Sequence, residues 1–160
     1  TMTDLCQYVD VCISNEEDAS DVFGIRAENT DIYGGRLDKA GYRSVAKQLT
    51  DRFGFDKTAI TLRTSISASD NNWAAMLYDG KDYYFSREYP LHITDRVGGG
   101  DSFGGGLIYA LLSGKSPQEA VEFAVAASAL KHSIEGDYNL VSVSEVERLA
   151  GGDASGRVQR

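Results

Sequence analysis

The chain has 160 residues, of which 42% are hydrophobic and 25% are charged, and its formal net charge is −8 at pH 7. This length and composition are typical of one ordinary globular domain. They argue against a nucleic-acid-binding protein, which needs clustered Lys and Arg to neutralise phosphates, and against a membrane protein, because no apolar run approaches roughly 18 residues.

The first segment is mostly apolar, and residues 9–14 are predicted to form a short strand. The chain reaches this strand without a lead-in, and Thr1-Met2 resembles neither an initiation site nor the start of a signal peptide. We therefore expect the chain to be part of a longer one. Cys6 and Cys12 lack the spacing and the His partners of a metal site, so they are interpreted as reduced core residues of a cytoplasmic protein.

Helix and strand signals alternate through the middle of the chain. Asn15 is a candidate helix N-cap that is followed by acidic residues. Residues 24–36 carry Gly, Asn and Asp without periodicity and are predicted to be a loop, whereas apolar residues recur at helical spacing over 37–53. Strands are predicted at 59–63, 74–78 and 82–85. The turn Asp79-Gly80-Lys81 is typical of a tight hairpin between the last two.

The last third of the chain is the most regular. Residues 102–113 are predicted to form a helix, and Ser116-Pro117-Gln118-Glu119 is a capping box that begins another, which ends near Lys131. This second helix is apolar nearly all round, which predicts a buried helix. Ser144-Glu145-Val146-Glu147 repeats the capping box before a short terminal helix, and residues 151–160 are expected to be a mobile tail. The alternation of strands and helices predicts an α/β layer fold with the hairpin as its antiparallel edge.

Residues 95–106 hold the candidate site, a run of glycines interrupted by Asp101. The structural interpretation is a loop in which Asp101 caps the following helix. It leaves Gly104 to Gly106 unexplained, because each glycine in a helix costs roughly 1 kcal/mol relative to Ala. Such glycines indicate that the backbone approaches another group closely. Glycines before a helix also leave N–H groups free to bind an anion, and an aspartate there can accept a proton from an attacking hydroxyl.

This run resembles the second signature of the ribokinase-like (PfkB) carbohydrate kinases, D-T-x-G-A-G-D-x-F-x-G-G. The matching positions are Asp95, Gly98, Gly100, Asp101, Phe103, Gly105 and Gly106. Arg96 and Gly99 differ from the pattern. The resemblance implies that Asp101 is the catalytic base, and that the ATP phosphates bind an anion hole at Gly98, Gly99 and Gly100. It also implies a monovalent cation near Asp95.

Weaker features fit the same family. Asn15-Glu16-Glu17-Asp18 resembles its N-x-x-E motif, which organises Mg²⁺ and phosphate; the alternative is simple helix capping. Thr61 and Arg63 lie in a segment similar to the nucleotide-binding strand, although Arg63 replaces the usual Gly. Ser128 lies where the family's helix lines the adenine pocket, with core packing as the alternative. Each of these roles is implied by the resemblance alone.

Within the family, the chain is most similar to the 2-keto-3-deoxygluconate kinases. The segments that carry this likeness are residues 15–19, 61–63, 129–132, 136–137 and 152–157. Asp137 matches a position that touches the substrate in those enzymes, with a turn residue as the alternative. His132 is interpreted as a packed or nucleotide-side histidine, because the base is already supplied. A ribokinase or a fructokinase is left open.

The resemblance covers the whole chain but only the C-terminal part of the family. It implies a Rossmann-like, three-layer ribokinase-like fold, with residues 1–150 as the nucleotide-binding and catalytic portion. The N-terminal half, which supplies most sugar contacts and a lid used for dimerisation, is then missing, so a homo-oligomer is left open for the intact protein. We expect the fragment to phosphorylate sugar poorly. The alternative class is a non-catalytic nucleotide-binding domain, whereas a dinucleotide-binding oxidoreductase is disfavoured because no acidic residue ends a second strand near 20 positions after the glycines.

Overall fold

The computed structural model describes residues 1–26 and 39–152. The elements in chain order are α1 (Met2–Leu5), the 3-10 helix η1 (Cys6–Tyr8), β1 (Val11–Ser14), α2 (Glu16–Phe23), α3 (Lys39–Phe53), β2 (Lys57–Ser65), β3 (Asp70–Tyr78), β4 (Tyr83–Phe85), β5 (Tyr89–His92), α4 (Gly99–Leu112), α5 (Pro117–Lys131) and α6 (Val143–Ala150). None of the helices in these two ranges has the length and apolarity needed to cross a membrane.

The strands form one mixed sheet with the order β1-β2-β3-β4, and β5 also pairs with β3. β1 runs parallel to β2, with Val11 opposite Lys57. The other pairs are antiparallel, so the predicted hairpin is confirmed as β3 and β4. The α/β fold with an antiparallel edge, expected from the sequence, is therefore what the structure shows.

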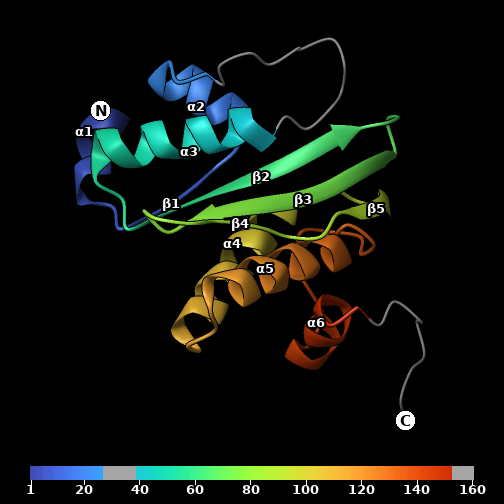
Figure 1. Cartoon of the computed structure of the whole chain (residues 1–160). Helices are drawn as coiled ribbons and strands as arrows, with labels where there is room; N and C mark the ends of the chain where they lie inside the picture. The colour runs from blue at the N-terminus through green and yellow to red at the C-terminus, as the bar shows by residue number, and fades with distance from the viewer. Residues whose placement is uncertain (27–38, 153–160) are drawn as a thin grey trace.

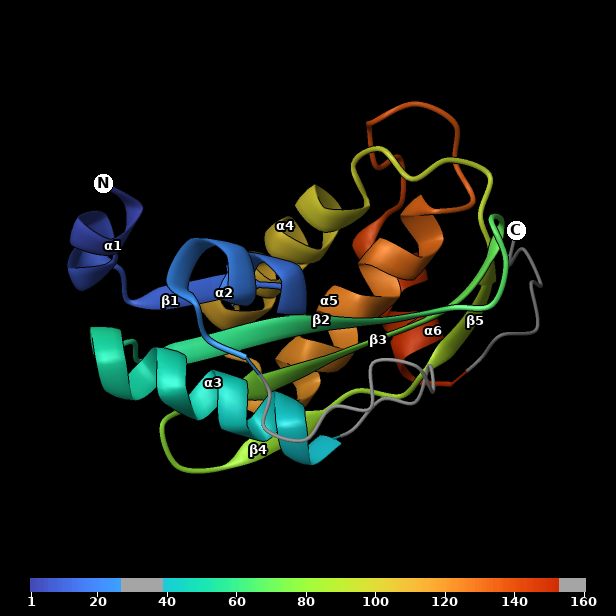
Figure 2. The same cartoon turned by 90° about the horizontal axis from the view of Figure 1, so that it is seen from above.

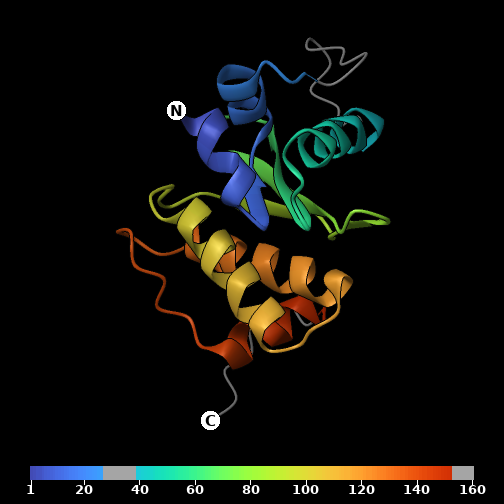
Figure 3. The ribbon, with the colours of Figure 1, turned by 90° about the vertical axis from the view of Figure 1, so that its left-hand side faces the viewer.

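Helices cover both faces of the sheet, as Figures 1 and 3 show: α1, α2 and α3 lie on one side and α4, α5 and α6 on the other. Successive residues of a strand point to opposite faces, and β3 supplies both cores. Trp73 and Leu77 pack in the cluster with α4 and α5, whereas Ala74 and Met76 pack in the cluster with α3. A strand buried on both faces reads as a continuous apolar run, which explains the composition of residues 73–78.

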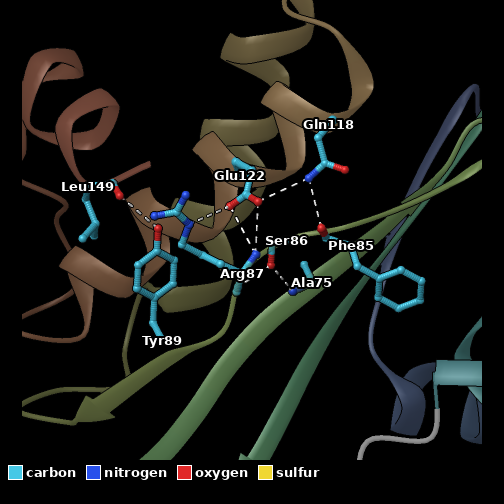
Figure 4. Close-up of polar contacts among 8 residues, drawn as sticks. All are labelled: Ala75, Phe85, Ser86, Arg87, Tyr89, Gln118, Glu122 and Leu149. Atoms are coloured by element: carbon cyan, nitrogen blue, oxygen red, sulfur yellow. Dashed lines mark hydrogen bonds and ion pairs between the residues drawn. The ribbon is translucent and has the colours of Figure 1, made fainter. Parts of the chain in front are cut away.

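The sheet is tied to the α4–α6 layer by polar contacts between β4 and β5 (Figure 4). The Ser86 hydroxyl accepts a hydrogen bond from the Ala75 amide at 3.0 Å, where the partner of β3 changes from β4 to β5. The Arg87 amide donates to the Glu122 carboxylate of α5 at 3.1 Å, and the Tyr89 hydroxyl donates to the Leu149 carbonyl of α6 at 3.2 Å. These contacts fix α5 and α6 against the sheet edge.

The predicted capping box of α5 is confirmed, with Ser116 as N-cap and Glu119 closing it. The prediction for α6 was wrong by two residues, because Ser142 is the N-cap and Glu145 closes the box. Starting at Ser142 places Val141 before the cap and Val146 at the fourth helical position, and both pack in the α4–α5 cluster. Apolar residues at these positions form a hydrophobic staple, which a start at Ser144 would not provide.

Several other predictions from the sequence differ from the structure or lie outside the described residues. β2 and β3 are longer than predicted, and β1 and β4 are shorter. The first residues of β3 were missed because they are polar. The short elements α1, η1 and β5 were not predicted. The loop predicted at 24–36 and the tail at 151–160 lie mostly outside the described residues, and so does the segment 153–157 used in the resemblance. The division at residue 150 stays a prediction. Cys6 and Cys12 are free thiols, of which Cys6 is buried and Cys12 half-buried.

Candidate active site

The candidate site is built around the start of α4. Gly98 is the N-cap and has a left-handed backbone with φ 77°. Asp101 is the third residue of the helix and its side chain is exposed. The structural interpretation of Asp101 as the N-cap is therefore wrong, because Gly98 already turns the chain into the helix.

The first turn of α4 presents free amides. The Gly99 amide donates to the Arg96 carbonyl at 3.2 Å and the Ser102 amide donates to the Gly98 carbonyl at 2.9 Å. Within residues 1–26 and 39–152, the amides of Gly98, Gly100 and Asp101 have no hydrogen-bond acceptor, whereas the Gly99 amide, also expected in the anion hole, is paired. Free N–H groups at the positive end of a helix bind anions, so this turn is a candidate phosphate site beside a carboxylate.

Close packing explains two of the three glycines in residues 98–100. A Cβ on Gly98 would lie 2.1 Å from the Asp137 carbonyl oxygen, and one on Gly99 would lie 2.7 Å from Cε1 of His132. A Cβ on Gly100 would meet nothing within 4 Å. Gly98 and Gly99 are thus required by the fold, whereas Gly100 leaves space on the exposed side of the turn.

The later glycines divide in the same way. A Cβ on Gly106 would lie 3.1 Å from the Cβ of Ala127 and 3.2 Å from the Cα of Ala124, so this glycine lets α4 approach α5. A Cβ on Gly105 would meet nothing within 4 Å. The close approach inferred from the sequence is therefore confirmed at Gly106, where the approaching group is a neighbouring helix.

Two buried residues, one in α5 and one at its C-cap, pack against the first turn of α4. Ser128 is fully buried, and its hydroxyl donates to the Gly99 carbonyl at 2.8 Å. His132 is buried, its Nδ1 lies 2.7 Å from the Ser128 carbonyl oxygen, and its ring packs on Trp73 at 5.1 Å. Burial lowers the pKa of His132, which favours the neutral ring. Both side chains are engaged within the fold, and His132 is the packed histidine that the sequence suggested.

The first hollow beside α4, the Asp101 hollow, has a volume of about 350 Å³. Asp101 and Asp137 both border it, so the structure brings the two candidate substrate residues together. The remaining lining comes from α4, α5, α6 and the segment before α6: Ser102, Gly105, Gly106, Tyr109, Phe123, Ala127, Tyr138, Asn139, Val141, Ser142, Val143 and Val146. Phe123, Val141 and Val146 give it an apolar wall, which the sequence analysis did not identify.

The second hollow, the Asn15 hollow, has a volume of about 170 Å³. It is lined by Asn15, Glu17, Tyr42, Thr61, Arg63 and Trp73. The structure thus brings together the candidate phosphate motif and the candidate nucleotide strand, which are some 45 positions apart in the sequence.

The four residues of the candidate phosphate motif are used differently. The Asn15 side chain caps α2 by accepting a hydrogen bond from the Asp18 amide at 2.7 Å, as the capping alternative predicted. Glu17 lines the Asn15 hollow, and Asp18 does not. The side chain of Glu16 lies outside the part of the chain that the structure describes.

Trp73 and His132 link the Asn15 hollow to the start of α4. Trp73 lines the hollow and packs on His132, whose ring lies directly beneath Gly99. The charge of Arg63, another lining residue, contributes to lowering the pKa of His132. The Asn15 hollow is therefore connected by packed side chains to Gly99, while Asp101 of the same turn borders the Asp101 hollow.

Asp95 lies in the loop before α4. Its Oδ1 accepts a hydrogen bond from the Val97 amide and its Oδ2 accepts one from the Gly136 amide, each at 2.9 Å. These two bonds, and the nearby charge of Lys131, hold the pKa of Asp95 below its usual value. Lys131, the last residue of α5, is fully buried, and the sequence analysis did not identify it because a lysine at a helix C-terminus is usually exposed.

The chain is similar in sequence to known carbohydrate kinases. Residues 1–144 match the model of the pfkB family carbohydrate kinases. A curated relative, the 2-dehydro-3-deoxygalactonokinase of Haloferax volcanii, is 30% identical over 112 residues, which are 69% of this chain and 33% of that protein.

Two solved structures extend the likeness to the fold. The 2-dehydro-3-deoxygluconokinase of Thermotoga maritima is 45% identical with a TM-score of 0.87, over 94% of this chain and 44% of that one. A PfkB family carbohydrate kinase of Listeria grayi is 33% identical with a TM-score of 0.78, over 94% and 43%.

This chain thus spans less than half the length of the relatives it matches. The family model matches residues 1–144, and each of the two solved structures covers 94% of the chain. The chain belongs to the pfkB family of carbohydrate kinases.

Proposed function

We propose that this chain is the ATP-binding and catalytic portion of a kinase that phosphorylates a sugar-acid hydroxyl, converting 2-keto-3-deoxygluconate to its 6-phosphate. The observation that carries the proposal is the first turn of α4, where an exposed carboxylate stands beside the amides of Gly100 and Asp101, which have no hydrogen-bond acceptor among the described residues. Phosphoryl transfer needs charge stabilisation on the phosphate and a base for the attacking hydroxyl, and this turn offers both.

The proposed reaction assigns one role to each part of the turn. Asp101 accepts the proton of the sugar hydroxyl as its oxygen forms a bond to the γ-phosphorus, and the bond between that phosphorus and the β–γ bridging oxygen breaks. The amides of Gly100 and Asp101 stabilise the charge on the phosphate oxygens. Gly98 and Gly99 hold these amides in place through their contacts with Asp137 and His132.

Magnesium enters the proposal as a partner of the nucleotide. The described residues contain no group of three or more His, Cys, Asp or Glu that could hold a metal ion. Mg²⁺ commonly keeps several waters and binds through substrate phosphates and one or two carboxylates. Glu17 in the Asn15 hollow is the residue placed to act in this way, with Thr61 and Arg63 nearby for the nucleotide.

The substrate assignment is supported by the relatives, whose names describe kinases of 2-dehydro-3-deoxy sugar acids. Within the chain, Asp137 is the candidate substrate contact because it borders the same hollow as Asp101. Binding across two hollows also suits a nucleotide, with the apolar wall of the Asp101 hollow available for a base.

A fusion tests the proposal, because the chain alone spans only part of its relatives. The preceding half of the Thermotoga maritima relative is joined to this chain, and ATP-dependent phosphorylation of 2-keto-3-deoxygluconate, ribose and fructose is measured. We expect turnover with the sugar acid, and Asp101→Asn should lower it by at least about 100-fold while leaving ATP binding unchanged. Glu135→Gln, an exposed carboxylate on the nearby turn, serves as the matched control.

Two results would contradict the proposal. Turnover retained by the Asp101→Asn fusion would rule out this base. A folded fusion that binds ATP but phosphorylates none of the three sugars would favour a non-catalytic nucleotide-binding domain. A preference for ribose or fructose would change the assigned substrate and leave the proposed phosphoryl transfer unchanged.

A further inference from the structure

A lysine side chain is buried where the fold meets the loop before α4. Lys131 is the last residue of α5 and its side chain has no exposed surface. Its Nζ donates a hydrogen bond to the Ile134 carbonyl at 3.0 Å. A buried ammonium is costly unless the surroundings compensate its charge, so the position must favour a cation.

Three features of the surroundings favour a positive charge there. Lys131 lies at the C-terminal end of α5, where the helix dipole is negative. The Ile134 carbonyl accepts a hydrogen bond from its Nζ, and Asp95 binds the Gly136 amide two residues further along the same turn, which brings a carboxylate to this segment. A carbonyl oxygen, a helix C-terminus and a carboxylate are the groups with which proteins also surround a free alkali cation.

A free cation at these groups would compete with Lys131. The resemblance implied a monovalent cation at Asp95, whose two oxygens accept amide hydrogen bonds from Val97 and from Gly136 and keep further lone pairs. The Ile134 carbonyl likewise accepts a hydrogen bond from Lys131 and keeps a second lone pair. The ammonium of Lys131 already supplies a positive charge here and would repel a second cation, so the residues present do not fit an additional one.

The position of Lys131 matters because two segments meet there. The Thr94 amide donates to the His132 carbonyl at 2.8 Å, and the Gly136 amide donates to Asp95. Gly98 packs directly against the carbonyl of Asp137. Figure 2 shows the segment after α5 lying beside the loop that leads into α4. Whatever fixes this segment therefore also fixes the first turn of α4.

We propose that the buried ammonium of Lys131 takes the place of a free monovalent cation beside Asp95 and holds the segment 133–137 against the loop before α4. Lys131 is then a positioning residue for the free amides of the first turn. The positive charge at this site is then part of the chain, and the conformation of the segment 133–137 does not depend on potassium.

Thermal unfolding of the 160-residue chain tests this without any catalytic assay. The midpoint is measured in potassium chloride and in tetramethylammonium chloride at equal ionic strength, because the second cation is too large for a protein cation site. Lys131→Met removes the charge and keeps the length of the side chain, and Lys131→Ala also opens space for an ion. Lys47→Met is the control, since Lys47 forms an exposed pair with Asp51 at 2.6 Å.

The wild-type chain should unfold at the same temperature in both salts. Both Lys131 variants should unfold about 5 °C or more below it, and potassium or methylammonium should restore part of the loss in Lys131→Ala alone. Lys47→Met should show no difference between the salts. This ion-specific rescue separates a cation role from simple packing.

A higher midpoint for the wild type in potassium would overturn the proposal, as would a Lys131→Ala chain that responds equally to both salts. If the Ala variant does not fold, the wild-type comparison still decides, together with the Met variant. None of these outcomes depends on the proposed kinase activity.

Discussion

Gly98→Ala tests whether the glycine before α4 is fixed by the fold. A non-glycine residue in the left-handed region costs roughly 1–2 kcal/mol, and Gly98 has φ 77°. The added Cβ would lie 2.1 Å from the Asp137 carbonyl oxygen, so backbone must move; overpacking of this kind costs about 1–3 kcal/mol. Together these give about 2–5 kcal/mol, which is a fall of about 5–15 °C in Tm for a chain of this size.

The assay is urea and thermal unfolding of the chain, with Gly100→Ala as the matched control. Gly100 lies two residues along the same turn, and its added Cβ would meet nothing within 4 Å. Because Ala is the better helix former, Gly100→Ala should leave stability unchanged or raise it by up to about 1 kcal/mol. Equal losses in the two variants, or no loss in Gly98→Ala, would refute the argument that close contact with Asp137 selects the glycine.

Three further predictions concern the supports of the site. Ser128→Ala removes the 2.8 Å hydrogen bond to the Gly99 carbonyl, which still belongs to the backbone ladder of α4, and should lower the free energy of unfolding by about 0.5–1.5 kcal/mol in urea. Ser142→Ala should lower it by about 1 kcal/mol and Ser144→Ala by less, because Ser142 is the N-cap of α6; the reverse order would contradict this. Burial, followed by nearby negative charge, raises the pKa of Cys12 to about 11. At pH 8 its thiolate is then about 100-fold scarcer than for a thiol of pKa 9, so iodoacetamide labelling, followed by mass spectrometry, should be slow and should rise up to about pH 11.

Elements that depend on local chemistry could be predicted from the sequence. Ser116 and Glu119 are three positions apart and form their capping box within one turn, so α5 was located to the residue. β5 was missed because Pro90 removes a strand hydrogen-bond donor and marks a segment as unlikely to pair. In the structure Pro90 lies opposite Asn72 on the outer side of β3, an edge position where a proline is tolerated. This tolerance depends on the sheet and not on the segment.

The same difference between local and long-range interactions applies to the candidate site. The signature in residues 95–106 predicted a helix start with free amides and a carboxylate, because those features are made by neighbours in the chain. The partners of that turn were not predictable in this way. Asp95 meets Gly136 across 41 residues, and the Ser128 hydroxyl meets Gly99 across 29. Such contacts depend on how α5 packs on α4, which no local pattern specifies.

The glycines of the signature show why a motif and a structure carry different information. Gly98 is excluded from bearing a side chain by the Asp137 backbone, so its replacement should harm the protein with no ligand present, and Gly106 is in tight contact with α5. Gly105 faces open space at the Asp101 hollow, so Gly105→Ala should stabilise the unliganded chain by up to about 1 kcal/mol. If ATP binding also weakens in Gly105→Ala, then Gly105 lowers the stability of the helix and is required for nucleotide binding. The sequence does not distinguish these two kinds of glycine. Building a Cβ atom at each position in the fold does, because it shows which glycines are required by packing and which are free to be required by a nucleotide.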